Sequence, residues 1–352
     1  MLKQMLHYAD FALNVARARL FSEKKPLEVC LKVTNRCNLR CPYCYGAYFD
    51  RESRDFTKEE LLSLIDELHQ MGTRVVDLSG GEPLLRDDIS EVIDRVKTNG
   101  MFCFMNTNGI LLPEKIAAVR KLDAVTISLD GDAKTNDTNR GEGTFKKIAE
   151  AVRTAKKEKL LVSTNTVINR NNLGSIDGIV SLAEEWGVTA GFNLPYARPP
   201  HSMEDPLISL KDEEIREVLQ KLVAHKKSGA PIAFSLASRE YTLNWPWSYG
   251  KKIIYGDLPA GFKAIDCYMG RFMCLVDSNG LVYPCGQLID NFPALNIHEV
   301  GFKKAWDNLL QKRTCKTCYS MCFNEINQVF GLSPGVFFSN GLRFLNNMIR
   351  RQ

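Results

Sequence analysis

Six short runs of β-branched and apolar residues alternate with longer amphipathic stretches between residues 28 and 200. The short runs are typical of strands, and the stretches between them carry apolar residues at helical spacing. This alternation predicts repeated βα units around a parallel sheet. Because a full barrel needs eight units, six predict an α/β fold with an open, partial (βα)6 barrel. The predicted strands cover residues 29–34, 74–78, 102–106, 124–129, 160–167 and 188–194.

Local signals mark where several helices begin and end. Thr57 followed three residues later by Glu60 is a capping-box signature. Gly72, Gly100 and Gly187 each follow a helical pattern, and glycine commonly ends a helix. The predicted helices cover residues 57–71, 88–99, 113–121, 144–159, 173–186 and, beyond the barrel, 212–227.

The pattern divides the chain into five predicted parts. The barrel at residues 28–200 is preceded by an amphipathic helix at residues 1–27 and followed by a linker and helical region at residues 201–262. A small cysteine-rich unit with a β-hairpin and a helix occupies residues 263–325, and an apolar, basic tail occupies residues 326–352. The two ends could make peripheral membrane contact, but packing against the barrel is the preferred interpretation.

Composition restricts the class of protein. Apolar residues make up 45% of the 352 residues, and the net charge of +5 is spread among acidic residues, which together predict a globular protein without a nucleic-acid surface. No apolar run reaches about 18 residues, and polar residues interrupt the first helix, so neither a membrane span nor a signal peptide is predicted. Eleven cysteines, nine of them at short spacings, favour metal ligation in a reducing compartment and hence a cytoplasmic protein.

Three cysteines, Cys37, Cys41 and Cys44, directly follow the first predicted strand. Their spacing lets one loop offer three thiolates to three irons of a cubane and leaves the fourth iron without a protein ligand. A closed cluster takes four cysteines, and structural zinc takes four nitrogen or sulfur ligands. A zinc knuckle, a redox dithiol or a reactive cysteine cluster is the alternative. Because parallel sheets hold ligands at the carboxyl ends of their strands, the position favours catalysis.

The triplet resembles the cluster motif of the radical S-adenosylmethionine (radical SAM) superfamily, whose fold is also a partial barrel. The resemblance implies a [4Fe-4S] cluster on the three cysteines. It implies that the amino and carboxylate groups of S-adenosylmethionine (SAM) chelate the open iron. It further implies that an electron from the cluster cleaves SAM to a 5′-deoxyadenosyl radical.

Segments at the next strand ends match the same superfamily. The run Ser-Gly-Gly-Glu-Pro at residues 79–83 resembles the segment that holds the SAM amino group, and a serine and an arginine farther on resemble contacts of the SAM carboxylate. An aspartate nearby resembles a ribose contact, and a tyrosine in the cysteine loop lies where adenine is contacted. Each residue alone could instead form a turn or pack in the core. The implied SAM contacts are Tyr43, Gly80, Gly81, Glu82, Asn106, Ser128, Asp130, Arg140 and Asn165.

A second group of cysteines lies in the C-terminal third. Cys267 and Cys285 flank the hairpin signal Asp-Ser-Asn-Gly at residues 277–280, which predicts that they meet at one end of a hairpin. Cys315, Cys318 and Cys322 follow a predicted helix at residues 303–310. The arrangement resembles the SPASM or twitch auxiliary-cluster domain and implies one auxiliary [4Fe-4S] cluster, with a second left open. The preferred ligands are Cys267, Cys285 and Cys322, with Cys318 ahead of Cys315; a zinc ribbon is the alternative.

The other cysteines have a simpler interpretation. Cys30 and Cys103 lie inside predicted barrel strands, and Cys274 lies inside a strand of the hairpin. Such positions are typical of small apolar side chains in a core. We therefore expect these three cysteines to pack rather than to bind metal.

The sequence thus predicts a radical SAM enzyme that abstracts a hydrogen from a substrate. A small or lipid-like substrate is preferred, because the N-terminal part is short for a peptide-recognition domain. A peptide-modifying maturase is the first alternative, and a non-catalytic iron-sulfur electron carrier is the second. A flavodoxin or ferredoxin is the expected electron donor. No general acid or base is identified.

Overall fold

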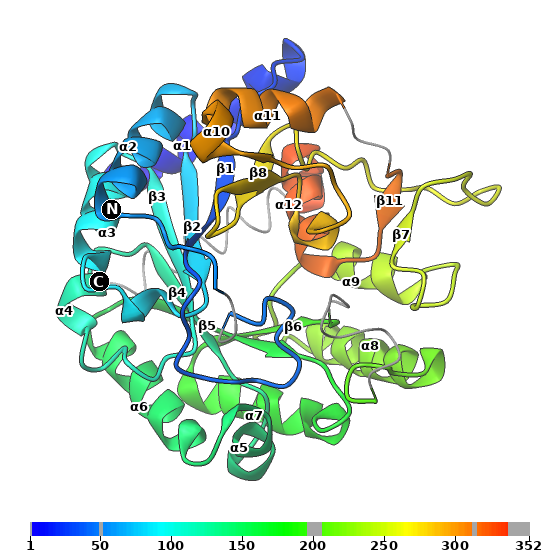
Figure 1. Ribbon diagram of the computed structural model, residues 1–352. Helices are drawn as coiled ribbons and strands as arrows, with labels where there is room; N and C mark the ends of the chain where they lie inside the picture. Colours follow the sequence, from blue (N-terminus) through cyan, green and yellow to red (C-terminus); the bar gives the residue numbers. More distant parts are fainter. Residues whose placement is uncertain (1, 49–51, 196–205, 312–314, 337–352) are drawn as a thin grey trace.

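The computed structural model describes residues 2–48, 52–195, 206–311 and 315–336. Six consecutive parallel strands form its central curved sheet, with helices on the outer side (Figure 1). This confirms the predicted open (βα)6 barrel. The first and last residues of each strand lie within about two residues of the predicted ones. The strands are β1 (Glu28–Thr34), β2 (Val75–Gly80), β3 (Phe102–Thr107), β4 (Ala124–Ser128), β5 (Leu161–Val167) and β6 (Thr189–Asn193).

The helices between the strands cover the outer face of the sheet. The predicted capping box forms: the Glu60 N–H donates to the Thr57 hydroxyl at 3.2 Å, and the Thr57 N–H donates to the Glu60 carboxylate at 2.9 Å. One helix, α5, is not predicted from the sequence. The barrel helices are α2 (Lys58–Gln70), α3 (Ile89–Thr98), α4 (Ile116–Val119), α5 (Ala133–Arg140), α6 (Thr144–Lys157) and α7 (Ile176–Trp186).

The predicted C-terminal hairpin forms, but it does not stand apart from the barrel. Its first strand, β8 (Met273–Val276), pairs in parallel with β1, and β9 (Leu281–Tyr283) and β10 (Leu295–Asn296) extend the sheet in antiparallel pairs. The sheet therefore has nine strands in the order β10-β9-β8-β1-β2-β3-β4-β5-β6. Since an open barrel leaves unpaired backbone groups on its edge strands, the hairpin satisfies those of β1.

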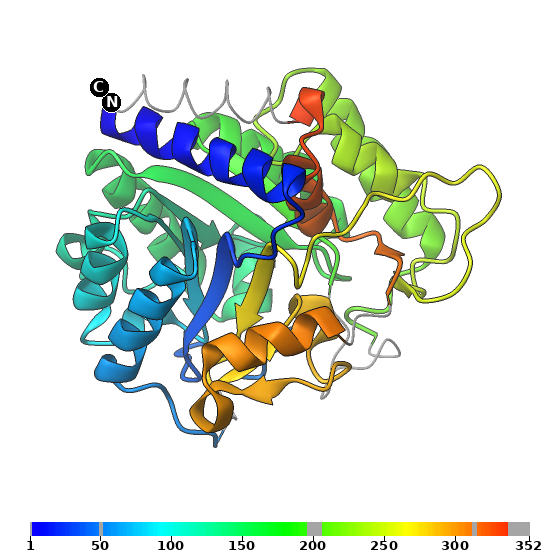
Figure 2. The same cartoon turned by 90° about the horizontal axis from the view of Figure 1, so that it is seen from above.

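The remaining elements surround the hairpin and the base of the barrel. Helix α1 (Leu2–Leu20) runs across the molecule beside α12 (Figure 2), and Phe11 contacts Phe330 with ring centroids 6.4 Å apart. Among residues 9–20 of this helix, whose side chains the structure describes, Val15 and Ala18 are completely buried and Leu13 is 69% exposed. The other elements are α8 (Asp212–Lys227), α9 (Leu236–Leu243), β7 (Ile253–Ile254), α10 (Ile297–Val300), α11 (Phe302–Gln311), β11 (Thr317–Cys318) and α12 (Met321–Phe330).

Every predicted part includes some residues outside the described ranges, and the tail and the linker are the most affected. The proposed tail at residues 326–352 is described only to residue 336, and the linker at residues 201–262 only from residue 206. Among the helices of the described residues, none has the length and apolar character needed to cross a membrane.

The two faces of the barrel sheet differ in polarity. Along β1, the apolar side chains of Val29, Leu31 and Val33 are completely buried under the helices. Residues of β4 and β5 alternate strictly between buried and half-buried positions, and the half-buried ones face the lumen. Four of these seven half-buried positions carry polar side chains, namely Thr126, Ser128, Ser163 and Asn165, whereas branched apolar side chains usually fill a barrel.

Candidate functional site

The first three cysteines lie in the loop that leaves β1 at the carboxyl edge of the sheet. The Cys44 N–H donates to the Cys41 carbonyl at 3.0 Å, which closes a tight turn. The Leu39 N–H approaches the Cys37 sulfur at 3.5 Å. Burial raises the pKa of Cys37 to about 11, and the neighbouring thiols of Cys41 and Cys44 add smaller increases. A metal bound here would therefore have to displace protons from the thiols.

Two glycines pack the exit of β2 directly against this loop. A Cβ atom at Gly80 would lie 2.5 Å from the Thr34 carbonyl oxygen, and one at Gly81 would lie 2.1 Å from the Arg36 carbonyl oxygen. The N–H groups of Gly81 and Glu82 donate to these same carbonyls at 2.9 and 2.8 Å. Because any side chain would push the two backbones apart, the glycines fix the beginning of the cysteine loop. The sequence does not predict this packing role.

The buried carboxylate of Glu82 ties the ends of β2 and β3 together. It accepts from the Thr107 hydroxyl and the Asn108 N–H at 2.7 Å each, and from the Leu84 N–H at 3.0 Å. Burial raises the pKa of Glu82, and the three donors oppose that rise. The Asn108 side chain also donates to the Asn38 side chain at 2.8 Å, inside the cysteine loop. Thr107 and Asn108 were not predicted from the sequence, although their position after a strand was a usable signal.

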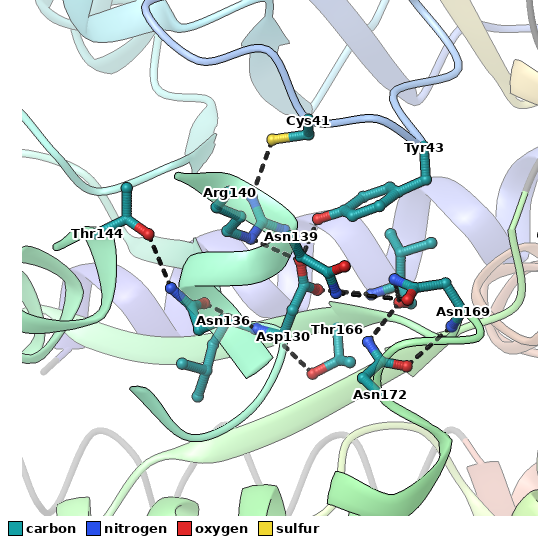
Figure 3. A network of polar contacts seen from close by, with 12 residues as sticks. Cys41, Tyr43, Asp130, Asn136, Asn139, Arg140, Thr144, Thr166, Asn169 and Asn172 are labelled. Carbon is teal, nitrogen blue, oxygen red and sulfur yellow. Dashed lines mark hydrogen bonds and ion pairs between the residues drawn. The ribbon is translucent and has the colours of Figure 1, made fainter. Parts of the chain in front are cut away.

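An ion pair between Arg140 and Asp130 lies beside the cysteine loop (Figure 3). Arg140 Nε is 2.8 Å from Asp130 Oδ2, and the Tyr43 hydroxyl donates to the same oxygen. The Val167 N–H approaches the other carboxylate oxygen at 3.3 Å. Arg140 Nη1 lies 4.0 Å from the Cys41 sulfur. The cysteine loop, the exit of β4 and the end of α5 therefore meet at this pair.

Asp130 and Arg140 differ in how their polar atoms are used. The Asp130 carboxylate has no accessible surface and is contacted by Tyr43, Arg140 and the backbone, and its contact with the SAM ribose stays a prediction. Arg140 Nε is buried and, within the described residues, makes no hydrogen bond of good angle. Nε is nevertheless paired with Asp130 at 2.8 Å, and Nη1 approaches Cys41, so the charge of Arg140 lies beside the cysteine loop, where an anionic group could bind.

Asparagine side chains, most of them buried, hold α5 in place. The Asp130 N–H donates to the Asn136 side chain at 3.1 Å, so the first turn after β4 is fixed to the helix. The Asn171 side chain donates to Asn139 at 2.8 Å, and Asn139 donates to Asn169 at 3.4 Å. These contacts join α5, which carries Arg140 at its end, to the loop after β5 (Figure 3). None of these asparagines was predicted from the sequence.

Three other predicted SAM contacts face the lumen. The Asn106 side chain donates to both carboxylate oxygens of Asp77 at 2.8 and 2.9 Å. Asn165 accepts from the Asn193 side chain at 2.7 Å, and Ser128 lies beside Asn165 in the pairing of β4 with β5. The predicted contacts thus divide into a group around the cysteine loop and a group on the lumen wall.

The five cysteines of the second unit also approach one another. Burial raises the pKa of Cys285 well above its usual value, and the thiols of Cys267, Cys318 and Cys315 raise it further. Burial likewise raises the pKa of Cys318, with additional increases from Cys267, Cys322 and Cys315. These thiols lie close enough to interact electrostatically. β11, which carries Cys318, pairs with β7 and thereby closes the unit.

The remaining three cysteines lie outside both groups. Cys103 and Cys274 are completely buried in the core, whereas Cys30 faces the lumen with its sulfur 3.5 Å from the Ser79 hydroxyl. In the part of the chain that the structure describes, no three cysteines, histidines or carboxylates converge tightly enough to hold one metal ion. Zinc needs such convergence. The sulfur ligands of a cubane bind separate irons and stand farther apart.

Comparison with known proteins identifies the family. Residues 31–183 match the model described as the radical SAM superfamily. The chain is 30% identical to the AdoMet-dependent heme synthase of Methanosarcina barkeri (strain Fusaro / DSM 804), over 80% of this chain and 82% of the relative. It is also 30% identical to the mycofactocin maturase MftC of Mycobacterium ulcerans (strain Agy99), over 80% of this chain and 74% of the relative.

A solved structure shares the fold. Streptococcus suis SuiB bound to its precursor peptide SuiA matches with a TM-score of 0.62 at 16% identity, over 85% of this chain and 72% of SuiB. The family match and the two relatives agree with the site described above, in which a three-cysteine loop lies at the edge of a partial barrel and two glycines pack against it. The chain therefore belongs to the radical SAM superfamily and is an enzyme.

Proposed function

We propose that Cys37, Cys41 and Cys44 bind the catalytic [4Fe-4S] cluster, and that the enzyme abstracts a hydrogen atom from a polar substrate in the barrel lumen. Members of the superfamily bind such a cluster and SAM. When bound, these cofactors supply the electron and the 5′-deoxyadenosyl radical. The observation that supports this proposal best is that the three-cysteine loop and the buried Arg140–Asp130 ion pair lie together at one edge of the sheet.

The chain's own residues prepare this site. Gly80, Gly81 and Glu82 fix the cysteine loop against the ends of β2 and β3. The buried guanidinium of Arg140 places a positive charge beside the cysteine loop, where an anionic group such as the SAM carboxylate would be bound. Ser128 stands on the adjoining lumen wall. A site held by these buried contacts needs little reorganisation when its ligands arrive.

We propose one auxiliary [4Fe-4S] cluster on Cys267, Cys285, Cys315 and Cys318. Cys285 interacts electrostatically with the other three thiols. Cys322, which the sequence ranked above Cys315, interacts with Cys318, and its sulfur lies 3.4 Å from the Ser320 hydroxyl. A hydroxyl contact to sulfur also suits a cluster ligand, so Cys322 is the alternative to Cys315 for the fourth position.

The character of the lumen favours a polar substrate over a lipid-like one. Lys32, Asp77 and Glu28 all project from the sheet to this side, and Asn106 binds Asp77. Burial raises the pKa of Asp77 to about 6 and that of Glu28 to about 8. Asn106 already donates to Asp77, and Lys32 lies over the Tyr45 ring. An acyl chain packed against these groups would still exclude the further polar partners that complete their hydrogen bonding, at a cost of about 1–3 kcal/mol per lost bond. Amide, hydroxyl or charged groups of a substrate would satisfy them.

A peptide is the second candidate substrate. The name of one relative, mycofactocin maturase MftC, and the solved structure of SuiB with its precursor peptide SuiA support it. The heme synthase relative supports a small molecule instead. The same proposal includes a cytoplasmic location, because cluster thiols need a reducing compartment, and a flavodoxin or ferredoxin as electron donor.

The catalytic part of the proposal is tested by product formation. The protein would be reconstituted with iron and sulfide under anaerobic conditions and incubated with SAM and dithionite. We expect 5′-deoxyadenosine from the wild type and none from the variant with all three first-site cysteines replaced by alanine. Absence of 5′-deoxyadenosine from wild-type protein with intact clusters would contradict the proposal.

The substrate part is tested by stimulation of that reaction. A short peptide, an iron tetrapyrrole and a phospholipid acyl chain would be compared at equal concentration. A polar compound is expected to raise the rate of 5′-deoxyadenosine formation, and Asp77→Asn is expected to reduce this stimulation. Stimulation by the acyl lipid alone would contradict the polar assignment.

A further inference from the structure

Arg140 contacts a cysteine of the catalytic loop rather than standing in solvent. Its Nη1 lies 4.0 Å from the Cys41 sulfur, and its side chain is only 6% exposed. The Tyr43 ring, whose centroid is 5.7 Å from the guanidinium carbon, covers another side of the cation. The positive charge of Arg140 is therefore held in a poorly solvated place beside the first cysteine group.

Asp130 balances part of that charge and fixes its direction. The carboxylate has no accessible surface and lies 2.8 Å from Arg140 Nε. The Tyr43 hydroxyl donates to the same carboxylate oxygen, so the anion is itself held. Buried charges interact strongly when water does not screen them. A change to either member of the pair therefore changes the electrostatic potential at Cys41.

Reduction adds one negative charge to an iron-sulfur cluster. Hydrogen bonds to its cysteine sulfurs and nearby positive charges stabilise the reduced form and raise the reduction potential. The sulfur of Cys41 receives such a contact from Arg140. The same charge lowers the pKa of the Cys41 thiol against the larger effect of burial.

We propose that Arg140 is a positioning residue that raises the reduction potential of the cluster held by Cys37, Cys41 and Cys44, and that Asp130 limits this effect. The inference rests on the proposed function, because it requires that cluster. It gives the pair a role in electron uptake that is separate from any contact with SAM. It also predicts opposite effects for the two partners, since removing the cation and removing the anion change the local charge in opposite directions.

The test is a potentiometric EPR measurement on the reconstituted protein without SAM. The auxiliary cluster would first be removed by replacing Cys285 and Cys318 with alanine, so that one signal remains. Arg140→Gln is expected to make the midpoint potential more negative, so that the ratio of reduced to oxidised cluster at the original midpoint falls about tenfold. Asp130→Asn is expected to make it more positive. Arg140→Lys, which keeps the charge without the planar fork, is expected between Arg140→Gln and the parent.

Matched measurements separate an electrostatic role from a structural one. Iron and sulfide would be counted in every variant, and Arg95→Gln, which removes an ion pair with Asp66 on the outer helices, serves as the control with an unchanged midpoint. A midpoint unchanged in Arg140→Gln, or shifted in the same direction in Asp130→Asn, would overturn the proposal. If Arg140→Gln does not hold the cluster, the direction of the shift in Asp130→Asn decides. Failure of the parent protein to bind any first-site iron would instead refute the proposed function.

Discussion

The two cysteine groups of this enzyme have different surroundings. Cys41 lies beside the Arg140–Asp130 ion pair, and Arg140 opposes the rise in thiol pKa that burial causes. Around Cys318 the pKa of the thiol rises through burial and neighbouring thiols, and the Tyr319 ring stands nearby. The first group is thus built into a charged network at the edge of the sheet. In the second group, Lys252 interacts with the Cys318 thiol, and aromatic rings pack around the cysteines.

The aromatic shell of the second group strengthens this contrast. Trp245 contacts Tyr319 with ring centroids 5.6 Å apart, and Tyr241 contacts Trp245 at 6.2 Å. The Tyr319 hydroxyl donates to the Tyr249 carbonyl at 3.0 Å. Large aromatic side chains bury much surface and exclude water. The second group therefore has an aromatic surrounding, whereas the first has a charged one.

The largest expected effect follows from removing the first group. Replacement of Cys37, Cys41 and Cys44 by alanine should abolish 5′-deoxyadenosine formation and remove about half of the bound iron and sulfide, because each cubane contributes equally. Chemical iron and sulfide determination measures the loss. Retention of all iron would show that the two groups are not separate sites and would break the comparison.

The ligands of the second group can be identified by substitution in protein that lacks the first cluster. Cys315→Ala should lose most of the remaining iron, whereas Cys322→Ala should keep most of it, because Cys315 is among the thiols that interact with Cys285. Absorbance near 400 nm and iron content measure this difference. Cys274→Ala, at a buried core position, is the control and should keep the cluster. The reverse order of Cys315 and Cys322 would restore the ranking made from sequence.

A glycine substitution tests the rigid packing of the first group. Gly81→Ala should destabilise the protein by about 1–3 kcal/mol and lower its activity, since the new Cβ atom would lie 2.1 Å from the Arg36 carbonyl oxygen. Gly178→Ala, in α7 with open space around the new atom, is the matched control and should stabilise by about 0.5–1 kcal/mol. Urea unfolding compares the two. Equal effects would mean that the cysteine loop does not depend on this contact.

The smallest expected effect concerns the polar lumen beneath the first group. The folded-state pKa of Glu28 is raised from 4.5 to about 8, mainly by burial, so the folded protein binds the proton more tightly than the unfolded chain. Stability from this group is therefore lost as pH rises between about 4.5 and 8. Glu28→Gln should stabilise the enzyme more at pH 9 than at pH 6.5, measured by anaerobic thermal unfolding. The same increment at both pH values would show that the carboxyl is well solvated.

Local signals predicted most of the barrel correctly because each depends on residues close in sequence. The strands, the capping box at Thr57 and the hairpin at residues 277–280 are of this kind. The pairing of β8 with β1 joins segments far apart in the chain, and no local pattern reveals it. Helix α5 was missed because its buried residues are Asn136, Asn139 and Arg140 rather than apolar side chains.

In the candidate site, too, local motifs were predicted and contacts between distant segments were not. The cysteines and the glycine-rich segment were recognised from motifs, but their mutual contacts were not. The sequence could not show that the Glu82 carboxylate accepts hydrogen bonds from Thr107 and Asn108. Nor could it show that Asp130 accepts a hydrogen bond from Tyr43 and forms an ion pair with Arg140. Those contacts depend on strands and helices that meet only in the folded chain. Lys32 and Asp77 were likewise overlooked, because lumen and core positions of a parallel strand cannot be told apart without the neighbouring strands.

The central claim is that the first three cysteines hold a cluster with one iron open to SAM. EPR spectra of the reduced enzyme with and without SAM test it most directly, in protein whose auxiliary cysteines Cys285 and Cys318 are replaced by alanine. The claim predicts one cluster signal whose g values change when SAM is added. A signal that SAM leaves unchanged, or iron bound by four protein ligands, would contradict it.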